Sequence, residues 1–503
     1  MTGARTTAAG GSAPAPELVQ GGFAYEIAGA DVLHDGLNLA DMAHLLQQHA
    51  NGIVPTADAA ALARVLLDAD AVSATQFGYD AQLGEPYNSR ERVFAGWLGD
   101  GAGWLHAGRP RREATRVAFR IHLRRQVCDL LLAVSRLAGA LAERAHEHRD
   151  TLFADHTYLQ QAQPSTVGHY LTSFAYPLLR DADRLLDVVA WINGSPGGAG
   201  CVNGSRLVTE RAPVADSLGF DTVITNTRDA MWQVDGLIQL AGVTASLACT
   251  QTSLAEDLEI WASSEFDYVD LADGFSRASV LMPQKRNPYA LSMIRGTTAL
   301  IIGHVTSVLA LQKSPSARSD SLIFVYGEVP VMVDHACRMT ELTAGVIETM
   351  AINEPRLLDQ LGRGFSQATD IAEELMVRAG LDYRSAYQVV GTAVRTLASD
   401  GRAARDLTPA DVDTAAREVL GRPIAIEAAD LAPVLDPAAI VASRTAVGGA
   451  APSAVDAMVQ EIRGRVDDLE AATRARVAGF DAAEVELRAR TRRLSTLEPT
   501  ERM

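Results

Sequence analysis

Residues 232–255 read WQVDGLIQLAGVTASLACTQTSLA and contain a single charged side chain, Asp235. A helix that is apolar or small on nearly every side has to be buried on every side. Within and just after this stretch, large apolar side chains recur every seven residues, at Leu240, Leu247, Leu254 and Trp261. Because a seven-residue repeat is the spacing of a packed helical seam, the stretch predicts a long helix inside a bundle.

Two further runs repeat this pattern. Residues 287–312 carry Arg295 as their only charge, and residues 322–337 are nearly as apolar, although Pro330 is expected to kink or interrupt a helix there. Three long, nearly uncharged helices have more apolar surface than one chain readily covers. We therefore expect them to pack against copies of themselves in a homo-oligomer.

Outward from these runs, the sequence predicts an all-α protein in which only residues 200–210 suggest short strands. A change to charged amphipathic helices after Asn353 marks a domain boundary, and a charged helix is expected from about 453 to 480. The sequence predicts four regions: a disordered tail at 1–20, an N-terminal helical domain at 21–112, a central bundle at 113–352 and a C-terminal helical domain at 353–503.

Composition limits the classes of partner and compartment. The chain has 45 Lys and Arg against 62 Asp and Glu, a net charge of -17, which argues against binding nucleic acid or an anionic membrane. Four scattered cysteines without a CxxC pair suit reduced thiols in the cytoplasm. The sequence shows neither a secretory signal nor an apolar run that we interpret as a membrane span.

A polar loop between two of the buried helices carries candidate chemistry. Residues 272–289 read ADGFSRASVLMPQKRNPY and place Ser279, Lys285 and Asn287 within nine positions. Lys285 is one of only two lysines in a chain that otherwise uses arginine. A hydroxyl, a cation and an amide grouped in this way could bind a carboxylate and take a proton from the carbon beside it.

The pattern SxxMPxKxNP at 279–288 resembles the signature loop of the fumarase/aspartase superfamily. Other segments are similar to the argininosuccinate lyase branch: LHAGRPRRE at 105–113, HTYLQQAQPSTVGHY at 156–170 and RTAVGGAAP at 444–452. The similarity runs in order over roughly residues 25–480. It therefore covers nearly the whole chain.

This resemblance implies a three-domain, all-α fold whose central bundle of long helices forms the core of a homotetramer, with active sites shared between subunits. It also implies reversible anti elimination of fumarate from an N-substituted aspartate, by carbon–nitrogen cleavage and without metal or organic cofactor. The proton removed is weakly acidic, so the aci-carboxylate that forms has to be stabilised by aimed amides and cations. A small dicarboxylate is the expected substrate.

The resemblance also assigns roles to residues of the motif. Ser279 matches the base, which needs activation by backbone donors and a cation because a serine hydroxyl is a weak acid. Lys285 and Asn287 match the groups that hold the carboxylate beside the deprotonated carbon. The other implied substrate-binding positions are His106, Arg111 and Thr157.

The acid half of the site departs from the family pattern. The family's ThrHisLeuGln reads Thr157-Tyr158-Leu159-Gln160 here, and the Glu that supports the His is replaced by Ser292. Tyr158 could donate a proton or simply pack, and His156 could substitute if the backbone placed it on the same face. A leaving group that departs without strong protonation would also explain the change.

The binding half departs as well. A substrate-binding Asn is replaced by Arg112, which could pair with an additional anion. The segment that holds the guanidino group of argininosuccinate appears as 317–323, without its Tyr and Gln. We therefore expect an amine half unlike arginine. The alternatives are a true argininosuccinate lyase with a rearranged site and a non-catalytic helical oligomer on the same scaffold.

Overall fold

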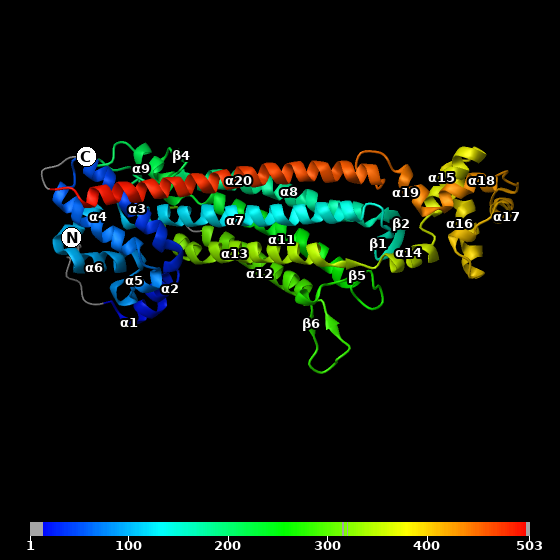
Figure 1. Ribbon diagram of the computed structural model, residues 1–503, viewed down its shortest axis with the longest axis horizontal. Coiled ribbons are helices and arrows are strands. Elements are labelled where there is room, and N and C mark those ends of the chain that lie inside the picture. The colour runs from blue at the N-terminus through cyan, green and yellow to red at the C-terminus, as the bar shows by residue number, and fades with distance from the viewer. Residues whose placement is uncertain (1–13, 314–315, 319, 499–503) are drawn as a thin grey trace, which may run out of the picture.

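The computed structural model of the chain describes residues 14–313, 316–318 and 320–498. Long helices run along an elongated body, with short helices gathered at both ends (Figure 1). The all-α fold class predicted from the sequence is confirmed, because the strands are short and occur as isolated pairs.

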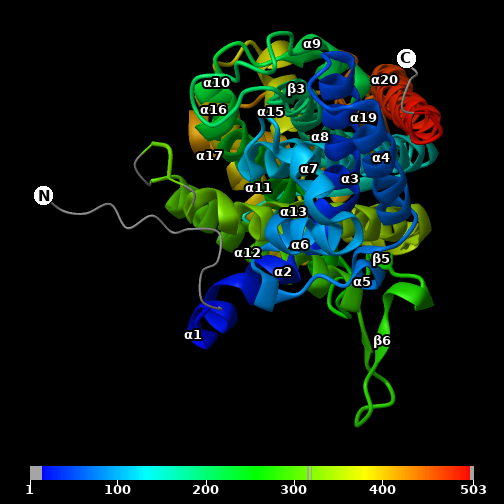
Figure 2. The same ribbon diagram turned by 90° about the vertical axis from the view of Figure 1, so that its left-hand side faces the viewer.

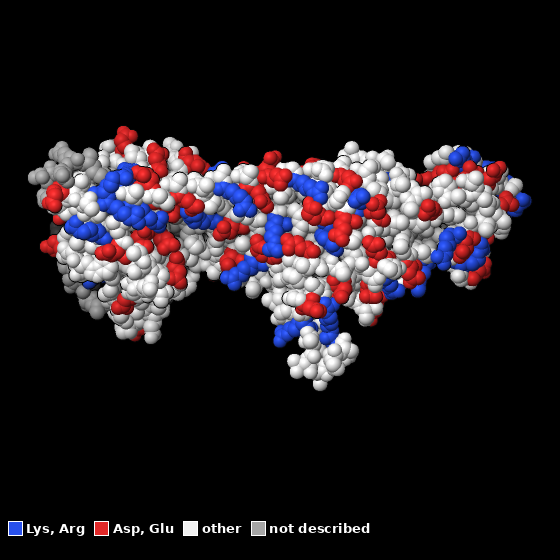
Figure 3. Space-filling model, viewed as in Figure 1, with Lys and Arg blue, Asp and Glu red and all other residues white. Residues whose placement is uncertain are grey.

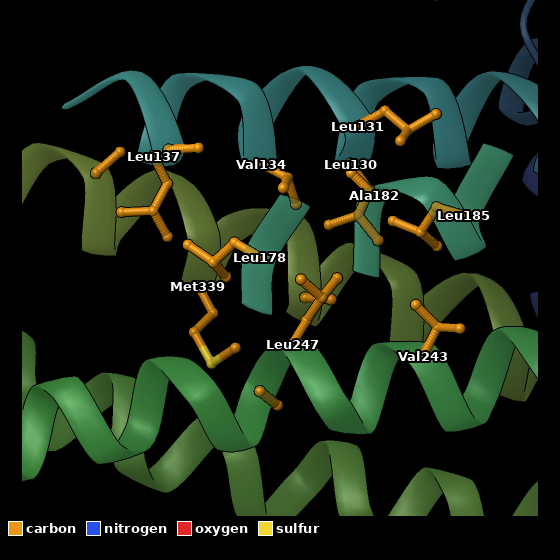
Figure 4. Packing of buried hydrophobic residues seen from close by; sticks show 14 of the residues in the cluster. Leu130, Leu131, Val134, Leu137, Leu178, Ala182, Leu185, Val243, Leu247 and Met339 are labelled. Atoms are coloured by element: carbon orange, nitrogen blue, oxygen red, sulfur yellow. The ribbon is translucent and has the colours of Figure 1, made fainter. Parts of the chain in front are cut away.

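Five long helices form the central bundle. They are α7 (Arg111–Glu147), α8 (Val167–Ile192), α11 (Asp235–Trp261), α12 (Tyr289–Gln312) and α13 (Asp320–Thr349). Leucine, valine and methionine side chains from α7, α8, α11 and α13 interdigitate at its centre (Figure 4). The seven-residue seam predicted on α11 is buried along its whole length, so that prediction is confirmed.

Helix α13 continues through Pro330, and the interruption expected there is wrong. The Pro330 carbonyl accepts a hydrogen bond from Gln126 Nε2 of α7 at 2.8 Å. Packing against α7 and α12 thus supports the helix across the proline.

The N-terminal elements cap one end of the bundle. The α-helices are α1 (Pro16–Leu18), α2 (Ala24–Ala28), α3 (Ala30–Ala50), α4 (Thr56–Asp70), α5 (Ala74–Phe77) and α6 (Pro86–Leu98). A π-helix at Val19–Phe23 and 3-10 helices at Ala81–Leu83 and Gly99–His106 join them. Of the expected tail at 1–20, residues 1–13 lie outside the described ranges, whereas helix is already present at Pro16.

The C-terminal region requires a correction. The short helices here are α14 (Glu354–Arg363), α15 (Ala368–Ala379), α16 (Tyr383–Ser399), α17 (Pro409–Leu420), α18 (Ala428–Leu435) and α19 (Pro437–Ser443), and α15 to α18 form a small domain with its own core. Helix α20 (Pro452–Ser495) leaves this domain and runs back along α7 and α8 to the N-terminal helices (Figure 1). Its apolar residues join the two other cores, so the predicted domain 353–503 includes a helix of the central bundle.

The strands have two to seven residues each and lie in pairs. The pairs are β1 (Leu152–Thr157) with β2 (Gln160–Thr166), β3 (Gly194–Ser195) with β4 (Thr222–Val223), β5 (Val269–Asp270) with β8 (Ala351–Ile352), and β6 (Arg277–Ala278) with β7 (Arg286–Asn287). Short helices α9 (Ala212–Ser217), α10 (Thr227–Trp232) and a 3-10 turn at Asp273–Phe275 complete the loops. Near 200–210 the described residues contain one isolated bridge, Ser205 to Val208.

Much of the surface of α12 is exposed, and it carries large apolar side chains on both flanks of the buried strip. Its exposed large side chains are Tyr289, Met293, Leu300, Ile302 and Leu309. By length and hydropathy this is the one helix among the described residues that could cross a membrane, so the sequence-based statement that no run qualifies needs correction. Length and hydropathy alone are weak evidence for a membrane span, because α12 packs against α11 and α13 and pairs its Arg295 with Glu256 and Glu259.

Candidate active site

The loop that carries Ser279 projects from the bundle as a narrow hairpin (Figures 1 and 2). At its base, β6 and β7 pair Arg277 with Asn287 and Ala278 with Arg286. The Asn287 amide donates to the Arg277 carbonyl at 2.9 Å. The tip is fully exposed, with Val280 at 104% and Leu281 at 85%. The hairpin therefore holds its predicted site residues away from the body of its own subunit.

Ser279 has a defined backbone environment within that loop. The Met282 N–H donates to Ser279 Oγ at 3.0 Å, and the Ser279 N–H donates to the Lys285 carbonyl at 3.2 Å. A donor aimed at Oγ favours negative charge on that oxygen. The structure thus brings Ser279, Lys285 and Asn287 together in one hairpin, with one backbone donor already on the hydroxyl.

The predicted substrate-binding Thr157 ends strand β1, and a tight turn follows it. Tyr158 and Leu159 have φ of 54° and 59°, and Thr157 pairs with Gln160 across the turn. Two consecutive positive φ values are those of a type I′ hairpin turn, which glycine and asparagine normally occupy. Such strain in non-glycine residues is concentrated at functional sites. The Tyr158 side chain is 99% exposed and points away from its own subunit.

His156 lies in a different environment from Tyr158. Its ring packs against Phe266 and Tyr268, with centroids 6.2 and 6.3 Å apart, and its buried Nδ1 has no hydrogen-bond partner. Burial lowers the pKa of His156, and the neighbouring Asp155 carboxylate opposes that shift. The neutral imidazole is therefore favoured, and the structure does not bring the ring beside the exposed Tyr158.

Arg111 and Arg112 open helix α7, and each has an acidic neighbour. Arg111 Nη1 lies 3.3 Å from Glu85, and Arg112 Nη1 lies 3.7 Å from Glu26. The Arg111 side chain is 44% exposed and Arg112 only 15%. Arg111 is thus the one that faces solvent, whereas Arg112 lines a cavity of about 220 Å³ between α2, α7 and α13.

Arg111 and Thr157 lie far apart within one subunit. Helix α7 has 37 residues and separates Arg111 from strand β1. At about 1.5 Å per residue it spans roughly 55 Å. The β6–β7 hairpin protrudes from the side of the body between these ends (Figure 1). A small molecule cannot touch Arg111 and Thr157 of the same subunit at once.

The comparisons with known proteins identify the family. A family described as "Lyase" matches residues 47–303, and one described as "Argininosuccinate lyase C-terminal" matches 365–442. An argininosuccinate lyase of Natronomonas pharaonis is 33% identical over 467 residues, which cover 92% of each protein. The chain belongs to the argininosuccinate lyase branch of the fumarase/aspartase superfamily. Another relative, from Halobacterium salinarum, is 34% identical over 86% of this chain and 87% of its own.

Solved structures agree with this membership. An EDDS lyase in complex with formate superposes with a TM-score of 0.85 and 25% identity over 96% of this chain and 97% of that chain. A variant of EDDS lyase with bound fumarate gives the same TM-score and identity over 96% of both chains. A class II fumarase from Schistosoma mansoni shares the fold at a TM-score of 0.67, with 14% identity over 82% of this chain and 90% of that chain. Membership of this branch makes the chain a carbon–nitrogen lyase.

Two supporting features of this lyase were not predicted from the sequence. Glu113 is buried and accepts backbone N–H groups of Gly198 and Gly200, both at 2.7 Å. Burial raises the pKa of Glu113 to about 7, against the opposing effect of these donors and of Arg109. Both glycines have positive φ, and a Cβ on Gly200 would lie 2.6 Å from the Gly204 carbonyl oxygen. Glu113 thus fixes a loop beside the arginine pair.

A buried charge cluster fixes the preceding segment. Arg109 donates to the Asp41 carboxylate and to the Tyr87 hydroxyl, and Arg90 donates to Asp41 at 2.8 Å. Next to this cluster, His106 Nε2 lies 3.0 Å from Glu91, which lowers the pKa of the Glu91 carboxyl. The signal in the sequence is the alternation of charged residues with small or apolar ones in 105–113. Its partners on α3 and α6 could be found only in three dimensions.

Ser292 stands where the family pattern has the Glu that supports its His. Ser292 donates to Glu259 of α11 at 3.4 Å, and Glu259 also pairs with Arg295. A carboxylate therefore lies near this position but belongs to a neighbouring helix and is matched by an arginine. Among the described residues, no group of three His, Cys, Asp or Glu side chains could hold a metal ion.

Proposed function

We propose that the protein catalyses reversible anti elimination of fumarate from an N-substituted aspartate, with Ser279 as the base. The observation that carries the proposal is the hairpin in which Ser279 Oγ already accepts the Met282 N–H, next to Lys285 and Asn287. When a substrate carboxylate is bound by Lys285 and Asn287, the carbon beside it faces the hydroxyl. The oxygen that loses its proton is stabilised by the backbone donor and the ammonium group.

The elimination then proceeds through an aci-carboxylate. Ser279, after its hydroxyl has lost its proton to solvent, takes the proton from the carbon next to the carboxylate. The electron pair left on that carbon is delocalised into the carboxylate, and Lys285 and Asn287 hold the resulting dianion. The pair then forms the double bond of fumarate while the carbon–nitrogen bond breaks and its electrons leave with nitrogen. Arg111 and Thr157 bind the remaining polar groups of the succinyl half, with His106 beside Arg111.

We assign the proton donor for the leaving nitrogen to Tyr158 rather than His156. Tyr158 is exposed at the tip of a strained turn, where it can reach a site on another subunit, whereas His156 packs inward against Phe266. A phenol hydroxyl is a hydrogen-bond donor that can give its proton to an amine nitrogen as it departs. An amine that leaves without protonation would make the Tyr158 hydroxyl dispensable.

The complete site is proposed to form between copies of the chain in a homotetramer. The exposed apolar side chains of α12 require cover, and Arg111 lies a full α7 length from Thr157. Packing copies through α12 would bring the β6–β7 hairpin of one subunit against segments of others. A soluble tetramer in the cytoplasm fits a metabolic lyase of this family.

The decisive experiment is fumarate release measured by proton NMR from a panel of N-substituted aspartates, with Ser279→Ala beside the wild type. Ser276→Ala, which removes another hydroxyl from the same segment, is the matched control. We expect release by the wild type and by Ser276→Ala and loss of at least about a thousandfold in rate with Ser279→Ala. Unchanged release by Ser279→Ala would refute the assignment of the base.

Argininosuccinate is the second candidate substrate, favoured by the 33% identity to an argininosuccinate lyase over 92% of both chains. Release from argininosuccinate alone in the same panel would establish it. A protein that neither releases fumarate from any member nor binds fumarate would be a non-catalytic scaffold. The retained Ser279, Lys285 and Asn287 argue against that outcome.

A further inference from the structure

A cavity of about 220 Å³ lies beside Arg112, where helices α2, α3, α7 and α13 meet. Most of its wall is apolar, formed by side chains that include Val32, Leu33, Ile323, Tyr326, Pro330 and Val331. The charged residues that line it are Glu26, Glu85 and Arg112. A concave apolar space with a few converging polar groups is the usual form of a small-molecule site.

The charges around the cavity disfavour an anionic occupant. Arg112 lies 3.7 Å from Glu26, and the neighbouring Arg111 lies 3.3 Å from Glu85, so each guanidinium already has a carboxylate partner. Burial raises the pKa of Glu26, which shows how poorly the cavity solvates negative charge. A ligand carboxylate placed here would face two acidic side chains in a weakly solvated space.

The wall contributed by α13 argues against a guanidino group as well. Ile323 ends the segment that, by the family resemblance, holds the guanidino portion of argininosuccinate, and here it presents an alkyl group to the cavity. Tyr326 also lines it, but its hydroxyl already accepts a hydrogen bond from Arg116 Nη1 at 2.8 Å. A guanidinium in this wall would lose water without finding new acceptors from α13, and the Glu26 and Glu85 carboxylates are already paired with Arg112 and Arg111.

The size of the cavity sets the size of the occupant. An apolar cavity of about 150 Å³ is large enough to hold benzene. At about 220 Å³, this one can take a single aromatic ring with a short linker, or a branched alkyl group. Tyr25 and Phe324, with ring centroids 4.9 Å apart, place a pair of aromatic rings beside it.

We propose that this cavity receives the amine half of the substrate, and that the amine is a small primary amine with an apolar body and no carboxylate. The inference rests on the proposed function and defines the substrate class of that site. In the reverse direction the amine nitrogen forms a bond to one olefinic carbon of fumarate, and the other carbon gains a proton. The amine loses one proton in forming the secondary amine, so atoms and charge balance.

Gly327 offers a way to fill the cavity. It lies on α13 facing α2, and a Cβ at this position would be 3.2 Å from the Tyr25 hydroxyl oxygen. A valine here would occupy the space between the two helices. Gly464 on α20 is a matched control, because it is also helical and a Cβ there meets nothing within 4 Å.

The experiment follows addition of amines to fumarate by proton NMR, using the full chain. Benzylamine and isobutylamine represent the proposed class, glycine a carboxylate-bearing amine, arginine the guanidino class and methylamine an amine that leaves the cavity empty. We expect the two apolar amines to be preferred over glycine and arginine by roughly tenfold or more in kcat/KM. Gly327→Val should lower kcat/KM for benzylamine by a similar factor and should change kcat/KM for methylamine little. Gly464→Val should leave kcat/KM for both amines unchanged.

A binding measurement separates this inference from the proposed chemistry. Saturation-transfer NMR of N-benzylaspartate is carried out on Ser279→Ala, with and without Gly327→Val. Binding that is lost only when Gly327→Val is added supports the cavity as the amine site, even if turnover fails and the proposed base is wrong. Preference for arginine or glycine, or N-benzylaspartate binding that Gly327→Val leaves unchanged, would overturn the inference while leaving a lyase function intact.

Discussion

Helices α11 and α12 lie side by side in the bundle and are both rich in apolar residues, yet their own chain buries the large apolar side chains of α11 more completely than those of α12. The apolar seam of α11 is buried between α8, α12 and α13, whereas α12 leaves Leu300, Ile302 and Leu309 exposed. Composition therefore indicates that the apolar side chains of both helices need to be buried, but not whether the same chain or another copy buries them. The loop that joins them carries Ser279, so the hairpin proposed to hold the base extends from between a helix whose apolar seam is buried and a helix proposed to pack against copies.

The largest effect is expected from placing charge on the exposed side of α12. Ile302→Asp combined with Leu309→Asp, seven residues apart on one face, should dissociate the oligomer, because buried carboxylates are not tolerated in an apolar interface. Without partner segments the site is incomplete, so fumarate release should fall roughly a hundredfold or more.

Sedimentation and the NMR assay measure this change together. Val485→Asp, at an exposed position on α20, is the control that adds one charge outside the bundle interface. A double variant that stays assembled, or a dissociated one that stays fully active, would contradict the dependence of α12 on copies.

A second prediction concerns hybrid oligomers. Ser279→Ala and Arg111→Ala change segments that we propose come from different subunits in each site, so each variant alone should be inactive. Co-expressed in equal amounts, they should recover up to about a quarter of wild-type activity, because random mixing leaves that share of sites with both segments intact. Absence of recovery in verified hybrids would place both residues in a site supplied by one subunit.

Third, shortening a buried side chain on α11 should lower the stability of the subunit independently of assembly. Leu247→Ala removes a fully buried side chain from α11 and should cost about 3 kcal/mol of unfolding free energy. Leu300→Ala on α12 should change that free energy much less at low protein concentration. Urea unfolding followed by circular dichroism at several concentrations distinguishes the two, and equal losses would remove the contrast between the helices.

The smallest effect is expected at Glu113, whose environment is also supplied by its own chain. Because its pKa is raised to about 7 in the fold, from an ordinary value of 4.5, folding favours its neutral form. Its contribution to stability is therefore fully present below pH 4.5 and is lost as pH rises towards and past 7, by on the order of 3 kcal/mol at most. Glu113→Gln should remove that slope.

The measurement for Glu113 is the unfolding free energy of wild type and Glu113→Gln between pH 4.5 and 8. The difference should shift in favour of the variant as pH rises, and it should not depend on protein concentration. Parallel pH profiles for the two proteins would show that Glu113 remains charged in the fold, held by the Gly198 and Gly200 N–H groups.

Some of the site could be predicted from the sequence because its residues are neighbours in the chain. Ser279, Lys285 and Asn287 fall within one irregular motif, and the hairpin brings them together without help from distant segments. The β1–β2 hairpin was missed because its residues lack the β-branched alternation of a strand and its turn uses Tyr158 and Leu159 at positive φ. Glu113 and the Asp41 cluster were missed because their partners are up to 87 residues away in sequence.

By itself, the sequence determined that the chain is helical, that three helices need apolar cover and that one loop carries a hydroxyl, a cation and an amide. These properties follow from local composition and spacing, which act within a few turns of the chain. Only the tertiary structure decided that α20 returns to the central bundle, that Arg111 and Thr157 are a helix length apart, and that an apolar cavity lies beside Arg112. Each depends on contacts between segments distant in sequence, which local patterns do not specify.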